Sequence, residues 1–381
     1  MTAPPPGPWL ADPRLARAFA LLRDGGHRAW AAGGAVRDDL MGRAPGDVDL
    51  ATDATPDRVV ALAAAAGIKA VPTGFDHGTV TLVVDGRPFE VTTLRRDVET
   101  DGRHAVVRFG ADLAEDAARR DFTLNALYRA PDGTLLDPIG GLPDALARKV
   151  RFVGDARARV REDHLRSLRF FRFHATHGDP EAGLDPDALD AVARHLEGLD
   201  ALSRERVTAE LLKLLAAPDP APAAAGMRAT GALARVLPGA SDALLAPLVH
   251  VEGLLGLPPE PLRRLAALGG EASGLRLSRA QARRLAALRD AAASAMGAGE
   301  LGYRLGADAP AALALRAAAQ GRPVAAAEAE AARAACGLRL PVTAADLAPL
   351  AGPALGERLR AVERAWIAGG FRAGREALLG E

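Results

Sequence analysis

The 381-residue chain contains one cysteine, three lysines and few aromatic residues. A single cysteine, Cys336, excludes an intramolecular disulfide and a cysteine-rich zinc site, and its alanine-rich surroundings predict an inert, buried thiol. No uninterrupted apolar run approaches the ~18 residues that a membrane-spanning helix needs. Residues 1–8 lack the basic and apolar stretches of a signal peptide. We therefore expect a cytoplasmic protein without a membrane partner, and no feature indicates an obligate protein partner.

Aromatic residues make up 4% of the chain and hydrophobic residues 49%, with alanine abundant. This mixture suits helices packed through small side chains better than a large β-sandwich. The length exceeds one hydrophobic core, so about two to four packed units are expected.

The formal net charge is zero, which by itself argues against a nucleic-acid partner. The average conceals a local excess, because residues 148–172 contain nine basic residues and three acidic ones, an excess of six positive charges. This excess indicates an anionic partner, although a solvated basic helix face would give the same pattern.

The pattern of apolar residues divides the chain into a mixed N-terminal part and a helical remainder. Short strands are expected at residues 27–32 and 48–50, a hairpin at 79–84 and 87–93, a polar mobile loop at 95–110, and a second strand pair at 127–129 and 134–137. After Pro143 the sequence predicts helices, with a linker at Pro218, Pro220 and Pro222. The expected fold class is α+β: a head with a small mixed or antiparallel sheet, followed by an all-α neck, body and tail.

Asp47 and Asp49 lie two residues apart in an apolar context. In a strand, the two-residue repeat places both carboxylates on one face. Mg²⁺ prefers carboxylate oxygens and completes its shell with phosphates and water, and such a pair can hold two ions during phosphoryl transfer. Two surface acids on an edge strand would give the same spacing.

A Gly33-Gly34 turn follows the first expected strand, upstream of these aspartates. Two glycines let the backbone approach a triphosphate, and the start of the following helix offers free N–H groups. Arg37 could then reach phosphate oxygens with its planar fork. Alone, a Gly-Gly turn is usually only a turn, but together with the paired carboxylates it predicts a metal–triphosphate site.

A polar stripe is expected further along, where Asp163, Arg166, Arg169 and Arg172 recur every three residues on one helix. A carboxylate beside a guanidinium can match the Watson–Crick edges of both cytosine and adenine, while guanine and uracil present the reverse pattern. The alternative is a surface ion pair worth less than about 1 kcal/mol.

Together with residues 119–126, which surround Phe122 with charged and hydrogen-bonding groups, these motifs resemble those of class II CCA-adding tRNA nucleotidyltransferases. This family is the bacterial poly(A) polymerase-like branch of the DNA polymerase beta superfamily. Its five motifs are matched in order by residues 33–38 with Asp47 and Asp49, residues 119–126, residues 137–141, residues 162–166, and residues 205–207 with Glu210. They span residues 33–210, nearly half of the chain.

The resemblance implies a role for each site residue. Asp47 and Asp49 would be catalytic and bind Mg²⁺, and Glu90 is a candidate third carboxylate. The nucleotide-binding residues would be Gly34, Arg37, Arg120, Asp163, Arg166, Arg169 and Arg172, of which Asp163 and Arg166 would select the base.

The resemblance also implies a domain organisation. The nucleotidyltransferase head would span residues 1–140, the neck 141–213, the body 214–300 and the tRNA-binding tail 301–381, with a hinge at residues 137–141. Residues 95–110 would correspond to the flexible segment that helps to switch from C to A addition. Residues 341–347 resemble a late family segment, but alanine replaces its expected glycine.

The implied function is template-independent addition or repair of the 3′-terminal CCA of tRNA. In a two-metal reaction, the tRNA 3′-hydroxyl would attack the α-phosphate of CTP or ATP and release pyrophosphate. Alternatives are an A-adding enzyme or poly(A) polymerase, a nucleotidyltransferase for small molecules, and a catalytically silent RNA-binding protein. The basic segment and the long helical arm count against the second, and the intact Asp47 and Asp49 count against the third.

Overall fold

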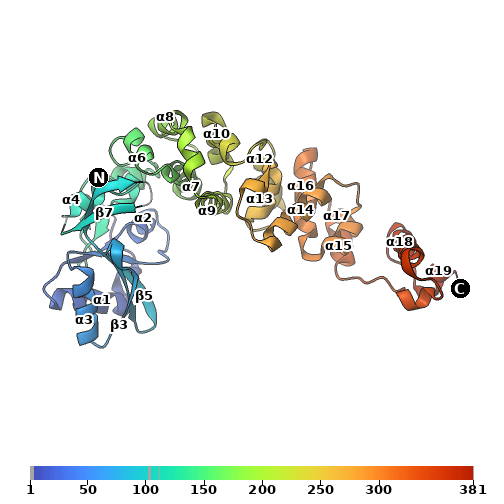
Figure 1. Ribbon diagram of the computed structural model, residues 1–381, viewed down its shortest axis with the longest axis horizontal. Coiled ribbons are helices and arrows are strands. Elements are labelled where there is room, and N and C mark those ends of the chain that lie inside the picture. The colour runs from blue at the N-terminus through green and yellow to red at the C-terminus, as the bar shows by residue number, and fades with distance from the viewer. Residues whose placement is uncertain (1–3, 102–103, 111, 381) are drawn as a thin grey trace. The chain divides into compact units, whose positions relative to one another are not determined.

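The structure, a computed structural model, describes residues 4–101, 104–110 and 112–380 (Figure 1). The chain forms two compact units, the first made of Met1–Leu214 and Pro222–Val236 and the second of Leu215–Ala221 and Leu237–Glu381. This division is coarser than the four parts expected from the sequence, and those four boundaries stay a prediction.

The first unit contains a seven-stranded mixed sheet in the order β3-β4-β5-β2-β1-β8-β9. Its neighbouring strands are antiparallel except for the parallel pair β2 and β5. The strands are β1 (Ala29–Ala32), β2 (Asp49–Thr52), β3 (Lys69–Gly74), β4 (Thr79–Val84), β5 (Arg87–Thr93), β8 (Tyr128–Arg129) and β9 (Leu135–Leu136). The expected mixed head sheet is therefore confirmed.

Two helices, α1 (Pro13–Asp24) and α3 (Pro56–Ala65), pack against the sheet and against each other (Figure 1). Leu15 and Leu22 of α1 and Val59 of α3 are almost completely buried. Burial of these apolar side chains supplies the main stabilisation of the head. The helix α2 (Gly34–Leu40) follows β1 directly.

The expectation of a loop at residues 95–110 is wrong for the described residues, and their mobility stays a prediction. These residues form a separate antiparallel hairpin of β6 (Arg95–Asp101) and β7 (His104–Phe109). The loop was expected because the segment is polar, but its valines and threonine favour extended backbone. The hairpin leads to α4 (Leu113–Ala118), which has an Asp112 capping box.

The remainder of the first unit is mainly helical. Its helices are α5 (Leu142–Leu146), α6 (Ala156–Glu162), α7 (Leu165–His177), α8 (Pro186–Arg194), α9 (Arg204–Leu215), α10 (Ala221–Thr230) and α11 (Ala232–Val236). The expected proline-rich linker falls between α9 and α10, where the chain passes between the two units. The α+β fold class is confirmed.

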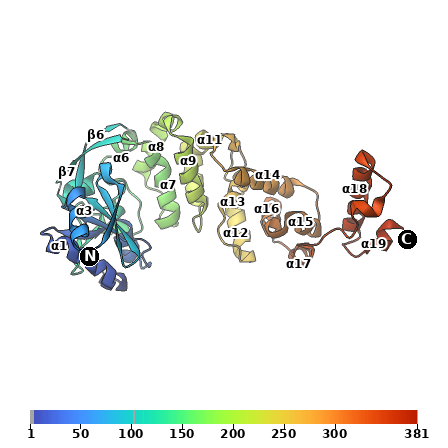
Figure 2. The same cartoon turned by 60° about the horizontal axis from the view of Figure 1, so that its bottom comes forward.

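The second unit is all helical and is organised around α16 (Ala309–Gln320). This alanine-rich helix is buried on most sides, as expected for a helix that is apolar all round. It contacts α12, α13, α14, α15 and α17, and Figure 2 shows α14 to α17 gathered together. The bounds are α12 (Leu245–Leu255), α13 (Pro261–Leu268), α14 (Arg279–Ala293), α15 (Ala298–Leu305), α17 (Ala326–Ala335), α18 (Gly352–Ala368) and α19 (Arg375–Leu379).

The prediction that Cys336 is buried is wrong, because its side chain is exposed directly after α17. Composition indicated an alanine-rich helix, but the cysteine falls at the C-cap, where the helix has ended. In the part of the chain that the structure describes, no helix is sufficiently long and apolar to cross a membrane.

A buried charge cluster ties the second unit together. Glu252 of α12 accepts hydrogen bonds from Arg263 (2.6 Å) and Arg264 (2.8 Å) of α13, and all three residues are at most 4% exposed. Arg264 also donates to the carbonyl oxygens of Leu215 (2.8 Å) and Pro218 (3.0 Å). These carbonyl groups stabilise the second positive charge, which a single carboxylate does not neutralise.

We expect Glu252→Gln to lower the free energy of unfolding by about 3–5 kcal/mol, because it leaves two buried guanidinium groups without a counter-ion. Urea denaturation at neutral pH measures the change. The matched control is Glu300→Gln, whose partner Arg304 is 37% exposed, and which should cost less than about 1 kcal/mol. Equal losses in the two variants would contradict this assignment.

Candidate functional site

The predicted phosphate turn and the predicted metal pair meet because of strand register. In the antiparallel pairing of β1 and β2, Ala32 lies opposite Asp49. The turn that begins at Gly33 therefore leaves β1 beside the start of β2. Gly33 has a φ of 66°, and a Cβ atom there would lie 2.9 Å from Nη1 of Arg120. The positive φ favours glycine at this position, and a Cβ atom would also displace the guanidinium group of Arg120.

Two carboxylates of the sheet face the same side. Leu50 of β2 pairs in parallel with Val91 of β5, and both side chains are buried. The residues just before them, Asp49 and Glu90, therefore both point to the other face of the sheet. Asp47 comes just before β2 rather than within it, which corrects the expectation that both aspartates lie in the strand. Burial, together with the charges of Glu90 and Asp47, raises the pKa of Asp49 to about 6.

A cavity of about 490 Å³ opens beside this turn. Its wall is formed by the Gly33 turn, α2, β2, the segment after α4, Asp163 with α7, and α9. The lining residues are Gly33, Gly34, Arg37, Asp49, Arg119, Arg120, Asp121, Asn125, Asp163, Leu165, Arg166, Arg169, Phe173 and Arg206. We call it the nucleotide cavity below, after the ligand that the sequence predicts for it.

Seven of the nine predicted site residues lie in this wall. They are Gly34, Arg37, Asp49, Arg120, Asp163, Arg166 and Arg169. Asp47 is not in the wall, although its charge acts on Asp49. Arg172 is also outside the wall and binds Glu210 of α9 at 2.5 Å. The roles assigned to the nine residues stay predictions.

The proposed base-reading pair lies in the wall, but its geometry differs from the expected stripe. Asp163 is not on the helix, because α6 ends at Glu162 and Asp163 adopts an extended conformation. Its Oδ1 atom accepts the N–H of Leu165 (3.1 Å) at the start of α7, a local bond typical of aspartate at a helix N-terminus. Its Oδ2 atom accepts a hydrogen bond from Arg206 (2.6 Å). Arg166 is instead paired with Glu162.

A series of hydrogen bonds connects residues in the cavity wall. Arg169 of α7 donates to Asp121 (2.9 Å), Asn125 donates to Asp121 (3.0 Å), and Arg37 of α2 donates to Asn125 (2.7 Å). Burial opposes ionisation of Asp121, but Arg169 and Asn125 outweigh it and lower the pKa of this carboxyl. These hydrogen bonds connect α7 to α2 through the carboxylate of Asp121 and the amide of Asn125.

A second buried carboxylate positions Arg120. Asp116 of α4 is 1% exposed and accepts hydrogen bonds from Tyr128 (2.6 Å), Arg119 (2.9 Å) and Arg120 (3.1 Å). Arg120 also donates to the carbonyl oxygen of Asn125 (3.2 Å). Its guanidinium group is thus fixed between the Gly33 turn and the buried Asp116, and its positive charge lowers the pKa of Asp49.

The excess of basic residues at 148–172 is largely neutralised by protein groups. Seven of the nine form ion pairs, and Arg148 donates to the carbonyl oxygens at the C-terminal end of α7. The acidic partners are Glu162 within the segment and Asp121, Asp144, Asp185, Asp190 and Glu210 elsewhere in the chain. In this fully described segment, Arg161 is the one basic residue whose side chain forms neither an ion pair nor a hydrogen bond. Counting charges in a window therefore overestimated the basic surface.

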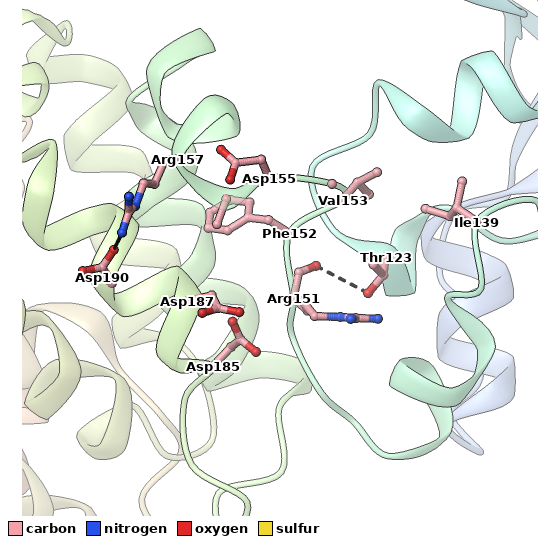
Figure 3. A pocket seen from close by; sticks show the side chains of 12 residues that line it. Thr123, Ile139, Arg151, Phe152, Val153, Asp155, Arg157, Asp185, Asp187 and Asp190 are labelled. Atoms are coloured by element: carbon pink, nitrogen blue, oxygen red, sulfur yellow. Dashed lines mark hydrogen bonds and ion pairs between the residues drawn. The ribbon is translucent and has the colours of Figure 1, made fainter.

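A separate cavity of about 510 Å³ lies between the predicted hinge and α8 (Figure 3). Asp185 and Asp190 on its α8 side are paired with Lys149 (3.2 Å) and Arg157 (2.7 Å). Asp155 caps α6 through the N–H of Ala158. Three of the four carboxylates that line this cavity thus have protein partners, and none of the predicted nucleotide-binding residues lines it.

Comparison with known proteins gives the same assignment as the motifs. A family model described as "Poly A polymerase head domain" matches residues 29–151, and one described as "Probable RNA and SrmB- binding site of polymerase A" matches residues 183–244. The crystal structure of the Bacillus stearothermophilus CCA-adding enzyme in complex with CTP superposes with a TM-score of 0.74 at 32% identity, covering 94% of each chain. The chain belongs to the family of CCA-adding nucleotidyltransferases.

Curated members of the family match between half and three fifths of the chain. The human mitochondrial CCA tRNA nucleotidyltransferase 1 is 47% identical over 190 residues, 50% of this chain and 44% of the human protein. The CCA-adding enzyme of Geobacillus thermodenitrificans is 41% identical over 235 residues, 60% of this chain and 56% of that protein. In these alignments the chain spans about half the length of the curated relatives.

Nucleotidyltransferases of this family generally use a divalent metal ion, and the residues present fit one. Burial and the neighbouring charges of Glu90 and Asp47 raise the pKa of Asp49, and a bound cation would offset the repulsion among these carboxylates. Among the residues that the structure describes, no three His, Cys, Asp or Glu side chains are grouped to hold a metal. The predicted ligands, Asp47 and Asp49, would leave the other positions around the ion for phosphates and water.

Several residues of the cavity were not predicted as site residues. Asp121 and Asn125 belong to the motif at 119–126 but had been given no role, and the same is true of Arg206 in the motif at 205–207. The sequence does indicate them, because all three residues lie within motifs that resemble those of the family. Their roles are visible only from contacts with residues far away in the sequence, such as Arg206 with Asp163.

We expect Asp49→Asn to stabilise the metal-free protein above pH 6 by about 1 kcal/mol, a value reduced for contact with water. The pKa of Asp49 is about 6 in the folded state against an ordinary 3.8, so its ionised form is disfavoured by folding and the cost appears as pH rises through this window. Urea denaturation with a chelator at pH 8 and pH 4 measures the difference, which should vanish at the lower pH.

The surface variant Asp24→Asn is the control and should show no such pH dependence. Adding a divalent salt should stabilise the wild type more than Asp49→Asn, because only the intact site binds the ion tightly. A pH-independent difference between Asp49→Asn and the wild type would contradict the assigned environment.

Proposed function

We propose that this protein adds or repairs the 3′-terminal CCA of tRNA without a nucleic-acid template, using CTP and ATP and releasing pyrophosphate. One observation carries the proposal: Asp163 and Arg166 line the same cavity as Gly33, Gly34 and Asp49. A triphosphate turn, a metal carboxylate and a pair able to read a base are therefore close enough to act on one nucleotide.

The triphosphate would lie against Gly33 and Gly34, where no side chain keeps it from the backbone. Arg37 and Arg120 would bind its oxygens with the N–H groups that their protein partners leave free. Asp47 and Asp49 would hold Mg²⁺, which when bound stabilises negative charge on the attacking and departing oxygens. The tRNA 3′-hydroxyl would attack the α-phosphate, forming the new phosphodiester bond as the bond to pyrophosphate breaks.

Base selection would rest on the charged groups at the start of α7. The oxygens of Asp163 each accept one protein hydrogen bond but retain further lone pairs. They can accept the exocyclic amine of cytosine or adenine, while an N–H of Arg166 donates to the neighbouring ring nitrogen. Arg206 would hold the carboxylate in this orientation. Guanine and uracil would present a carbonyl oxygen to Asp163 and leave both groups unpaired.

The names of the relatives support tRNA as the acceptor, and the matched segment at residues 183–244 supports RNA binding. A cytoplasmic location and the role of residues 95–110 in switching from C to A addition remain predictions from the sequence. An A-adding enzyme or poly(A) polymerase is the alternative, since it would use the same head.

Incorporation on tRNA that lacks its CCA end tests the proposal. CTP alone should give products extended by CC, and CTP with ATP should restore CCA, as read by sequencing the 3′ ends. Asp47→Ala should abolish incorporation while leaving tRNA binding nearly intact, because it removes a metal carboxylate only. Addition of A to tRNA ending in CC without any use of CTP would identify the A-adding alternative, and no incorporation by the wild type would refute both.

We expect Asp163→Asn to lower kcat/KM for CTP and ATP by about 10- to 100-fold, because the amide loses a charged acceptor and the partner of Arg206. Discrimination against UTP and GTP should fall as well, because the amide also offers a donor. Steady-state incorporation of each nucleotide measures both effects. Glu181→Gln, at an exposed position after α7, is the control. Unchanged discrimination in Asp163→Asn would contradict the base-reading role.

A further inference from the structure

Phe173 of α7 lies in the wall of the nucleotide cavity with three guanidinium groups around its ring. The Cζ atoms of Arg37, Arg169 and Arg172 are 5.5, 5.4 and 4.4 Å from the ring centroid. Each distance is within the range of a cation–π interaction. The side chain is 6% exposed, so these contacts are shielded from water, which strengthens them.

Each of these guanidinium groups has a polar partner besides the ring. Arg37 donates to Asp38 (2.9 Å) and Asn125, Arg169 donates to Asp121, and Arg172 donates to Glu210. Each is therefore held between a polar oxygen and the aromatic ring. A planar group restrained in this way has fewer orientations than one restrained by a single ion pair.

The ring itself is held by neighbouring aromatic side chains. Its centroid lies 4.9 Å from that of Phe122 and 5.4 Å from that of His177. Burial and the charges of the surrounding arginines lower the pKa of His177 to about 3, so this imidazole is neutral at pH 7 and adds no fourth positive charge. Three like charges can converge here because the ring face offers partial negative charge and the carboxylates supply the rest.

We propose that Phe173 is a positioning residue for nucleotide binding: its ring holds Arg37 and Arg169 in the cavity wall in the orientation that binds the nucleotide's phosphates. Arg172 lies outside the wall and contacts the same ring. The inference rests on the proposed function, because it requires that the cavity binds a nucleoside triphosphate. It identifies the triphosphate, common to CTP and ATP, as the part of the substrate that Phe173 affects.

The test replaces the ring by an aliphatic side chain. Phe173→Leu should raise KM for CTP and for ATP by a similar factor, about tenfold, with kcat changed less than twofold. The phosphate contacts are made in both the ground state and the transition state, so their loss appears in KM. The ratio of CTP to ATP use should not change, because Asp163 and Arg166 are untouched. Phe173→Tyr keeps an aromatic face and should retain most of the wild-type affinity.

The matched control is Phe170→Leu on the same helix. Phe170 is fully buried against Phe152 and Phe171, and no described guanidinium group lies over its ring. It should lose as much thermal stability as Phe173→Leu, or more, but leave both KM values near those of the wild type. A purely structural role for Phe173 predicts instead that the two variants behave alike.

A double variant tests whether the ring acts through Arg169. In an Arg169→Gln background, Phe173→Leu should raise KM by clearly less than in the wild type, because part of what the ring positions is already absent. Full additivity, or KM values in Phe173→Leu equal to those in Phe170→Leu, would overturn this inference while wild-type incorporation still stood. A wild type that neither binds nor incorporates CTP would instead refute the proposed function on which it rests.

Discussion

The ion pair between Asp121 and Arg169 is the contact on which the nucleotide cavity depends. Asp121 follows α4 and Arg169 lies on α7, 48 residues later in the chain. The same carboxylate holds Asn125, which binds Arg37 of α2. The carboxylate of Asp121 therefore fixes both the helix after the glycine turn and the helix that follows Asp163, the proposed base-reading residue. Without it, no shared carboxylate would connect the two sides of the cavity.

Arginine dominates the positive charge of this protein, and most of the arginines around the cavity are already paired. Asp116 holds Arg120, Glu162 holds Arg166 and Glu210 holds Arg172. A guanidinium group has five N–H donors in a planar fork, so an internal ion pair leaves donors for a ligand. Pairing therefore orients these groups and still permits binding, whereas a lysine in the same position would have a less defined direction.

The proposed metal site differs, because its carboxylates repel one another. Asp49 is near two other acidic groups, and its pKa is raised rather than lowered. Folding therefore brings together carboxylates that repel one another, a cost that a divalent ion with its bound phosphates would offset. A site of this kind is incomplete in the protein alone, which is consistent with a requirement for metal and triphosphate together.

Residue patterns along the chain predict the head, the helical remainder and the residue types of the site, because Gly33, Asp47 and Asp49 follow local rules of turns and strands. They fail at residues 95–110, where polarity outweighed the extended preference of valine, and at Asp163, which terminates a helix instead of joining it. The pairing of Arg206 with Asp163 and the three arginines around Phe173 are visible only in the folded chain. Those contacts join segments distant in the chain, and their geometry follows from packing, which local periodicity does not encode.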